Sequence, residues 1–139
     1  MKLDIKAIQN MNLFEKITGV KSKYCLTYNN ALIFIVPRHM MSKALGPGGS
    51  NISNISRRLN KKVRVIPHPQ AQNTIELERF IRAMIYPHDF KSIVHENTEL
   101  IIFSMPRTKA ALIGRNKQRI GELSDILEEF FGIKHILIK

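Results

Sequence analysis

Tryptophan is absent from this chain of 139 residues, and cysteine occurs once, at Cys25. A single cysteine excludes an internal disulfide and any metal site built from a cysteine cluster. No apolar run approaches the roughly 18 residues that a transmembrane helix needs. The first residues also lack the apolar stretch of a signal peptide. We therefore expect a cytoplasmic protein with no membrane partner.

Acidic residues are missing from the long segment between Glu15 and Glu76. Residues 1–69 contain 12 Lys and Arg and 2 acids, net +10, whereas residues 70–139 contain 10 and 9, net +1. The whole chain carries +11. A basic balance is often only a solvated face, but a stretch this long without acids favours a polyanionic partner.

Catalytic chemistry finds little support in the sequence. The five histidines are scattered without the spacing of metal ligands, and Cys25 has no evident activating partner. Glu122, Asp125, Glu128 and Glu129 recur at intervals typical of a solvated helix face. No phosphate-loop or dinucleotide motif occurs. We expect no catalytic residue, no cofactor and no metal.

One pattern of residues occurs twice along the chain. Each copy has an apolar strand ending in Pro-Arg, a short helix, a glycine-containing turn, a second amphipathic helix and a closing strand. The matching positions are Pro37-Arg38 with Pro106-Arg107, Gly46 with Gly114, and Ile52, Ile55 and Leu59 with Ile120, Leu123 and Leu127, the last three 68 positions later. An internal duplication predicts two similar structural units.

Periodicity and turn residues predict the elements of each copy. For the first copy they are a helix over 3–18 ended by Gly19, strands over 23–28 and 31–36, a short helix over 38–45, a turn over 46–49, a helix to about residue 60 capped by Ser50 or Asn51, and a strand over 62–66. For the second copy they are a helix over 74–86 with Ile75 on its apolar side, strands over 90–95 and 100–105, helices over 108–113 and 117–131, and a strand over 133–139. Prolines 67 and 69 mark a linker, so we expect domains over 1–69 and 70–139.

Both glycine turns are set among basic residues. Such a turn can simply let two helices pack closely, or it can bring main-chain N–H groups and a helix N-terminus against phosphates. The surrounding positive charge favours the second function. The candidate phosphate-binding residues are Lys43, Gly46, Pro47, Gly48, Gly49, Arg57 and Arg58 in the first copy, and Gly114, Arg115, Asn116, Lys117 and Arg119 in the second.

Aliphatic residues beside the turns could form a shallow groove for bases. The candidates are Leu45, Ile52, Ile55, Val63 and Val65 in the first copy, and Ile113, Ile120, Leu123 and Ile136 in the second. At helical spacing such residues are more often core than contact. Ile52 and Ile120, nearest the turns, are the two that we assign to base contact.

The repeated unit resembles the K homology family of single-stranded nucleic-acid-binding domains, in the type II arrangement where an extra helix and strand precede the core. Gly46-Pro47-Gly48-Gly49 fits that family's G-x-x-G loop, which clamps about four nucleotides. Gly114-Arg115-Asn116-Lys117 departs from it at the closing glycine. Two tandem copies in one short chain are similar to the archaeal NusA-like transcription proteins.

The resemblance implies an α+β fold of two tandem type II K homology domains, each a three-stranded sheet covered by helices on one face. It also implies a non-enzymatic protein that binds single-stranded RNA in transcription elongation, termination or antitermination, with RNA polymerase or other transcription proteins as further partners. We expect a monomer. One alternative is an RNA-binding factor of ribosome assembly or translation. Another is a protein-interaction module in which the second copy uses Ile126, Phe130 or nearby residues.

Overall fold

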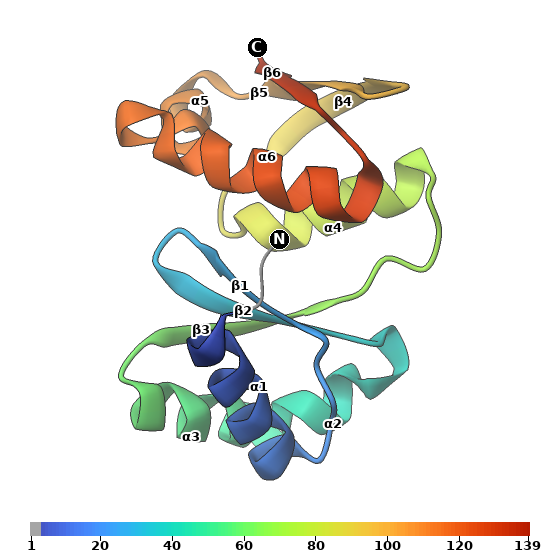
Figure 1. Cartoon of the computed structure of the whole chain (residues 1–139). Helices are drawn as coiled ribbons and strands as arrows, with labels where there is room; N and C mark the ends of the chain where they lie inside the picture. Colours follow the sequence, from blue (N-terminus) through green and yellow to red (C-terminus); the bar gives the residue numbers. More distant parts are fainter. Residues whose placement is uncertain (1–3) are drawn as a thin grey trace. The chain divides into compact units, whose positions relative to one another are not determined.

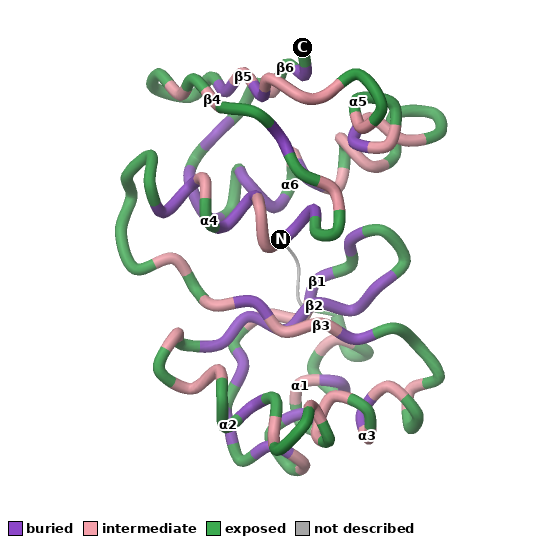
Figure 2. Tube along the Cα trace, turned by 180° about the vertical axis from the view of Figure 1, so that it is seen from behind, coloured by how far each residue is buried: buried purple, intermediate pink, exposed green. Residues whose placement is uncertain are grey.

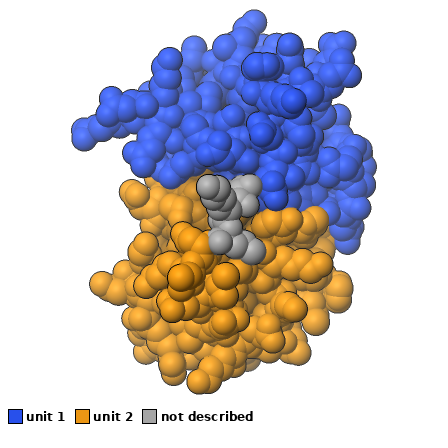
Figure 3. Space-filling view, in the orientation of Figure 1, with its two compact units in different colours: residues 1, 69–139 blue, residues 2–68 orange. Residues whose placement is uncertain are grey.

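A computed structural model describes residues 4–139 of the chain (Figure 1). These residues divide into two compact units, one ending at His68 and the other running from Pro69 to Lys139 (Figure 3). Each unit has the same order of elements, namely helix, two strands, two helices joined by a 3-10 turn, and a last strand. The expected α+β fold with three-stranded sheets and helices is therefore confirmed.

The first unit begins with α1, whose N-cap Asp4 accepts a hydrogen bond from the Ala7 N–H at 2.7 Å. Gly19 ends this helix in the left-handed region, at φ 73°. The elements of the unit are α1 (Ile5–Thr18), β1 (Tyr24–Tyr28), β2 (Ala31–Val36), a 3-10 turn (Arg38–Met40), α2 (Met41–Leu45), a second 3-10 turn (Pro47–Gly49), α3 (Ser50–Leu59) and β3 (Lys62–Pro67). Leu3, which the sequence places in the first helix, lies outside the described residues.

The second unit begins with α4, which Asn73 caps by accepting a hydrogen bond from the Glu76 N–H at 2.8 Å. Its elements are α4 (Thr74–Ile85), β4 (Phe90–Glu96), β5 (Glu99–Ser104), α5 (Pro106–Ile113), a 3-10 turn (Arg115–Lys117), α6 (Gln118–Phe131) and β6 (His135–Ile138).

The sheet of the first unit has the order β1-β2-β3, with β2 at its centre. Strand β1 pairs with β2 in antiparallel fashion and β3 pairs with β2 in parallel. All six residues of β2 are buried, which explains why Ala31–Val36 is apolar without alternation.

The helices of the first unit pack on one face of this sheet. Phe34 of β2 is fully buried and stacks on Phe14 of α1, with ring centroids 4.4 Å apart. Ala44 of α2 and Ile55 of α3 complete the same cluster and are also fully buried. These contacts fix the positions of α2 and α3, and therefore of the turn between them.

The second sheet repeats the topology in the order β4-β5-β6. Leu100 and Ile102 of β5 are buried, at 1% and 0% exposure. Ile101, between these two residues, faces the other side of the sheet. The strand register places Val94 and Leu137 beside it on that side. Val94 and Leu137 are 51% exposed, so this face carries an open apolar row. Figure 2 colours the chain by burial and shows exposed (green) and intermediate (pink) stretches along β4 to β6.

Several sequence predictions about these elements are wrong. Ser50 and Asn51 lie inside α3, because Gly49 is its N-cap. Ile75 is 63% exposed and lies off the buried side of α4. Helix α5 starts at Pro106 and not at residue 108, and β6 starts at His135 and not at 133.

The Pro-Arg pairs do not occupy equivalent positions either. Pro37 precedes its helical turn as the N-cap, with ψ 142°, whereas Pro106 is the first residue of α5 and Met105 is its N-cap, with ψ 148°. The glycine turns differ by 68 positions and the prolines by 69. The structural repeat therefore follows the glycines.

Replacing Phe34 with Ala should destabilise the first unit by roughly 3–5 kcal/mol, because it removes a fully buried ring and its stacking partner contact. Urea unfolding followed by circular dichroism measures this change. Ile5→Ala, at a 75% exposed position of α1, is the control and should alter stability by less than about 0.5 kcal/mol. Equal effects of the two substitutions would contradict the assignment of the core.

Candidate nucleic-acid interface

The first glycine turn connects α2 to α3 through a run of positive φ angles. Gly46 has φ 75° and ψ 170°, Gly48 has φ 60° and ψ 24°, and Gly49 has φ 73° and ψ 19°. The Gly49 N–H donates to the Gly46 carbonyl at 3.1 Å, and the Gly46 N–H donates to the Ser42 carbonyl at 3.1 Å. Glycine occupies each of these positive-φ positions at no steric cost.

The second turn adopts the same backbone, with Gly114 kept and Asn116 and Lys117 in the places of Gly48 and Gly49. Gly114 has φ 78° and ψ 169°, Asn116 has φ 55° and ψ 30°, and Lys117 has φ 60° and ψ 23°. Positive φ is tolerated by Asn but is strained for Lys. The second copy therefore retains the loop conformation of the first although its sequence departs from the G-x-x-G pattern.

The four loop glycines serve two different purposes. A Cβ on Gly46 would lie 2.8 Å from the Asn51 side chain, and one on Gly114 would lie 2.6 Å from the Arg119 Cβ. These two glycines permit the close approach of the following helix. A Cβ on Gly48 or Gly49 would meet nothing within 4 Å, so their backbone borders open space.

The helices that follow the turns lack side-chain caps. Asp4 and Asn73 cap α1 and α4, but Gly49 and Lys117, the N-caps of α3 and α6, form no side-chain capping bond. The first N–H groups of a helix have no partner within the helix, and they carry the positive end of its dipole. The Ser50 and Gln118 N–H groups donate to the Pro47 and Arg115 carbonyls of the preceding 3-10 turns. The other N–H groups of the first turn form a helix N-terminus suited to an anion.

The basic residues proposed from the sequence do not all gather at the turns. Lys43 is exposed three residues before Gly46, and its carbonyl accepts a hydrogen bond from Asn51 Nδ2 at 3.1 Å. Arg57 and Arg58 lie in the last turn of α3, about 10 Å along the helix from its start. Arg58 donates from Nε to Asn54 Oδ1 at 3.1 Å. They border a different part of the surface from the loop.

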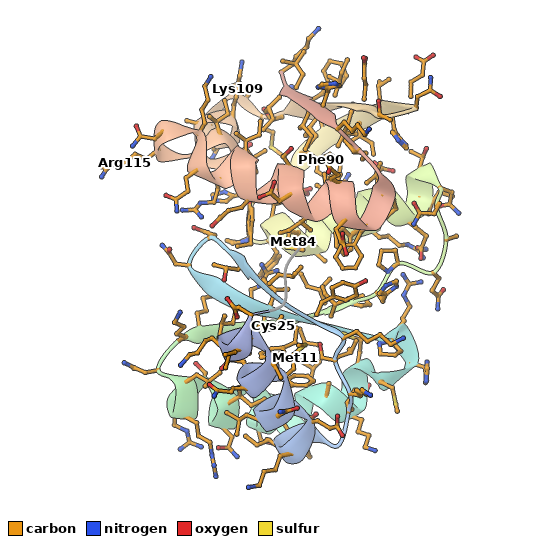
Figure 4. All side chains as sticks on the ribbon, in the orientation of Figure 1. Met11, Cys25, Met84, Phe90, Lys109 and Arg115 are labelled. Atoms are coloured by element: carbon orange, nitrogen blue, oxygen red, sulfur yellow. The ribbon has the colours of Figure 1, made fainter. Side chains whose placement is uncertain are left out.

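In the second turn, Arg115, Asn116 and Lys117 are exposed, and Arg115 projects outward from the turn in Figure 4. Arg119 behaves differently. Its side chain is only 15% exposed and forms an ion pair with Glu122. The structure therefore uses Arg119 to hold the first turn of α6 and does not present it with the loop residues.

The aliphatic candidates separate into core and surface. Ile55, Val63 and Leu123 are at most 7% exposed, so these three candidates for the base groove are wrong. Leu45 is 36% exposed. The other candidates are half-buried, among them two residues in the first turns of α3 and α6: Ile52, Val65, Ile113, Ile120 and Ile136.

The proposed protein-docking residues of the second copy are buried, Ile126 at 1% and Phe130 at 7%. The choice of these two residues is wrong because both side chains belong to the core side of α6. The open apolar row of Val94, Ile101 and Leu137 was missed. Part of its signal was available, because Ile101 lies between the buried Leu100 and Ile102 in a predicted strand and must face the other side of the sheet.

Cys25 packs against the core of the first unit. Burial raises the pKa of its thiol, an effect partly opposed by a hydrogen bond with Asn10. A raised pKa keeps the thiol protonated and therefore weakly nucleophilic. Among residues 4–139, no three His, Cys, Asp or Glu side chains gather as a potential metal site. No helix in the same range has the length and apolar character needed to cross a bilayer.

Comparison with known proteins adds distant relatives that cover the chain. No family model matches it. The "Probable transcription termination protein NusA" of Methanococcus vannielii is 25% identical over 142 residues, which cover 99% of this chain and 79% of that protein. The protein of the same name from Halococcus morrhuae is 26% identical and covers 94% of this chain and 92% of its own length. Archaeal NusA-like proteins are thus similar to nearly the whole chain at low identity.

A solved structure shows the same fold. The crystal structure of a protein designated APE1850 superposes with a TM-score of 0.67 and covers 99% of this chain and 100% of its own. At 24% identity this likeness concerns the fold alone.

Replacing Lys117 with Gly should stabilise the protein by about 0.5–1 kcal/mol, because it removes a side chain from a left-handed position and offsets the greater freedom of glycine in the unfolded chain. Urea unfolding measures the change. Arg115→Gly removes the same charge from the same turn at a position without positive φ, and should be neutral or destabilising. If both variants shift stability alike, Lys117 is not strained.

Proposed function

We propose that the chain consists of two type II K homology domains, residues 1–69 and 70–139, that bind single-stranded RNA. The protein is not an enzyme in this proposal. Phosphates lie against the Gly46–Gly49 turn and the N-terminus of α3, with Lys43 beside them. Arg57 and Arg58 meet the strand further along α3.

The observation that carries the proposal is the pairing of an open, positive-φ turn with an uncapped helix in both units. Gly48 and Gly49 border open space, and the N-cap of α3 makes no side-chain bond to its first N–H groups. Main-chain donors at such a terminus bind phosphate oxygens without reading sequence. The net charge of +10 over residues 1–69 favours the same ligand.

The second domain contributes less in this proposal. It has the same backbone at Gly114–Lys117, but its net charge is +1 and Arg119 is engaged by Glu122. Arg115, Asn116 and Lys117 meet phosphate through exposed side chains. Ile52 and Ile120, half-buried beside the two turns, provide the apolar contact for bases.

The biological role that we propose is transcription elongation, termination or antitermination in the cytoplasm, with RNA polymerase or other transcription proteins as further partners. Its support is the name of the archaeal relatives, which describes transcription termination. The expectation of a monomer remains a proposal as well.

Replacing Gly48 and Gly49 together by Asp should weaken RNA binding roughly 10- to 100-fold, the equivalent of two or three lost phosphate contacts. The fold should survive, because a Cβ has room at both positions and Asp tolerates positive φ. Fluorescence anisotropy with labelled oligouridylate measures binding. The control replaces Gly48 and Gly49 by Asn, which has the size of Asp and also tolerates positive φ but carries no charge. Its loss of RNA affinity should be smaller. Wild-type affinity in the Asp variant would show that this turn is not the clamp.

Binding should depend steeply on salt. If four to six phosphates are neutralised, the slope of log affinity against log salt concentration should lie at about −3 to −4 for a single strand. Titrations of single-stranded RNA, single-stranded DNA and duplex RNA at several salt concentrations give this slope for each polymer. A slope near zero, or tighter binding of the duplex, would contradict the proposal.

A further inference from the structure

The end of α1 lies against Lys43, the basic residue nearest to the first turn in the sequence. A Cβ on Gly19 would come within 3.3 Å of Lys43 Cε and 3.6 Å of Lys43 Nζ. Lys43 belongs to α2, and α1 and α2 are neighbours in the first unit (Figure 1). Lys43 therefore connects two parts of the surface, the Gly46–Gly49 turn and the segment that follows α1.

That segment presents lysines on one exposed edge. From Thr18 to Lys23 the chain alternates strictly, with Thr18, Val20 and Ser22 buried and the residues between them exposed. The exposed positions are Gly19, Lys21 and Lys23. Lys16, in the last turn of α1, is exposed as well.

The segment is held rigidly in this orientation. Ser22 Oγ donates to the Ile35 carbonyl of the central strand at 2.9 Å. The Val20 N–H donates to Thr18 Oγ1 at 3.0 Å, and Val20 is 1% exposed. The Cα atoms of Lys21 and Lys23 can lie at most about 7 Å and 14 Å from that of Gly19, because they are two and four residues further along the chain. Their spacing is therefore set before any ligand binds.

These lysines are not neutralised by ion pairs, although Glu15 precedes Lys16 in the sequence. Within the described part of the chain, Lys16, Lys21, Lys23 and Lys43 take part in no ion pair. Lysines that form internal pairs would lose those pairs on binding an anion, whereas these four would not.

The corresponding place in the second unit is built differently. Arg82, in the last turn of α4, pairs with Glu78 at 3.7 Å and also with Asp89, and its guanidinium lies 4.0 Å from the centre of the Phe90 ring. Its charge is used inside the unit. At the 68-residue offset of the repeat, Lys16, Lys21 and Lys23 correspond to Met84, Asp89 and Lys91, so the second unit keeps one of the three lysines.

We propose that Lys16, Lys21 and Lys23 extend the RNA-binding surface beyond the glycine turn. The strand passes from Gly46–Gly49 over Lys43 and continues along the edge formed by these three lysines. This inference rests on the proposed RNA-binding function and adds to it a second stretch of phosphate contacts. The contacts carry no sequence information, and they make affinity depend on the length of the RNA.

The test compares oligouridylates of about four and about twelve nucleotides, because the loop itself clamps about four. The variant carries Lys16→Gln, Lys21→Gln and Lys23→Gln, all at exposed positions. Its affinity for the longer RNA should fall roughly 10- to 100-fold, and its salt slope should lose about 2, since each single-strand contact contributes about 0.7. Affinity for the shorter RNA should change by less than about twofold, because the turn is intact.

A matched control removes the same charge elsewhere. Lys91→Gln, Lys134→Gln and Lys139→Gln together lie at exposed positions of the second unit and also lower the net charge by three. This variant should bind the longer RNA within about threefold of wild type. An equal loss in both variants would overturn the proposal, because the effect would then be one of net charge alone.

The remaining outcomes separate this inference from the function on which it rests. If the longer RNA binds no more tightly than the shorter one, or if the lysine variant binds it normally while the Gly48→Asp, Gly49→Asp variant does not, the lysine edge is refuted and the clamp stands. If the wild-type protein binds neither RNA, the proposed function itself is refuted.

Discussion

The close approach of helix to helix at Gly46 and Gly114 is the constraint on which both units depend. At each position a Cβ would overlap the first turn of the next helix, at 2.8 and 2.6 Å. Because the chain must reverse there within a few residues, the following residues take positive φ and no side chain reaches back to cap the helix. The packing requirement thus exposes the helix N-terminus. The open turn and the anion-binding terminus are two results of one geometric condition.

Much of the fold could be predicted from the sequence because its signals are local. The apolar run at Ala31–Val36, the helix end at Gly19 and the recurrence of Ile52 and Ile55 at 68 positions each reflect the backbone or its immediate neighbours. The N-cap of α3 could not be predicted this way. Ser50 is a good N-cap residue by type, but tertiary packing at Gly46 shifts the helix start. The Pro-Arg pairs matched by composition, yet Pro37 is an N-cap and Pro106 is the first residue of its helix.

The site was only partly readable, because residue type does not reveal which neighbour a side chain will meet. The sequence marked both turns, yet it could not separate Gly46, which is needed for packing, from Gly48, which borders open space. It grouped Arg119 with the loop residues, whereas Glu122 one helical turn later engages it. It placed Arg57 near the turn, although α3 separates the two by most of its length. Each of these three errors concerns a contact in the folded chain. Sequence periodicity cannot predict such a contact, because it assigns the same character to residues of the same type.

The two turns also differ in how much freedom they hold before any ligand arrives. Pro47 has its φ fixed by the pyrrolidine ring and begins a 3-10 turn between two helices. Arg115 occupies that place in the second unit and has no such restriction. Immobilising a long side chain on binding carries an entropy loss of about 0.5–1.5 kcal/mol. At this one position the first turn is therefore preorganised by Pro47, whereas the second turn must immobilise the Arg115 side chain to hold the same strand.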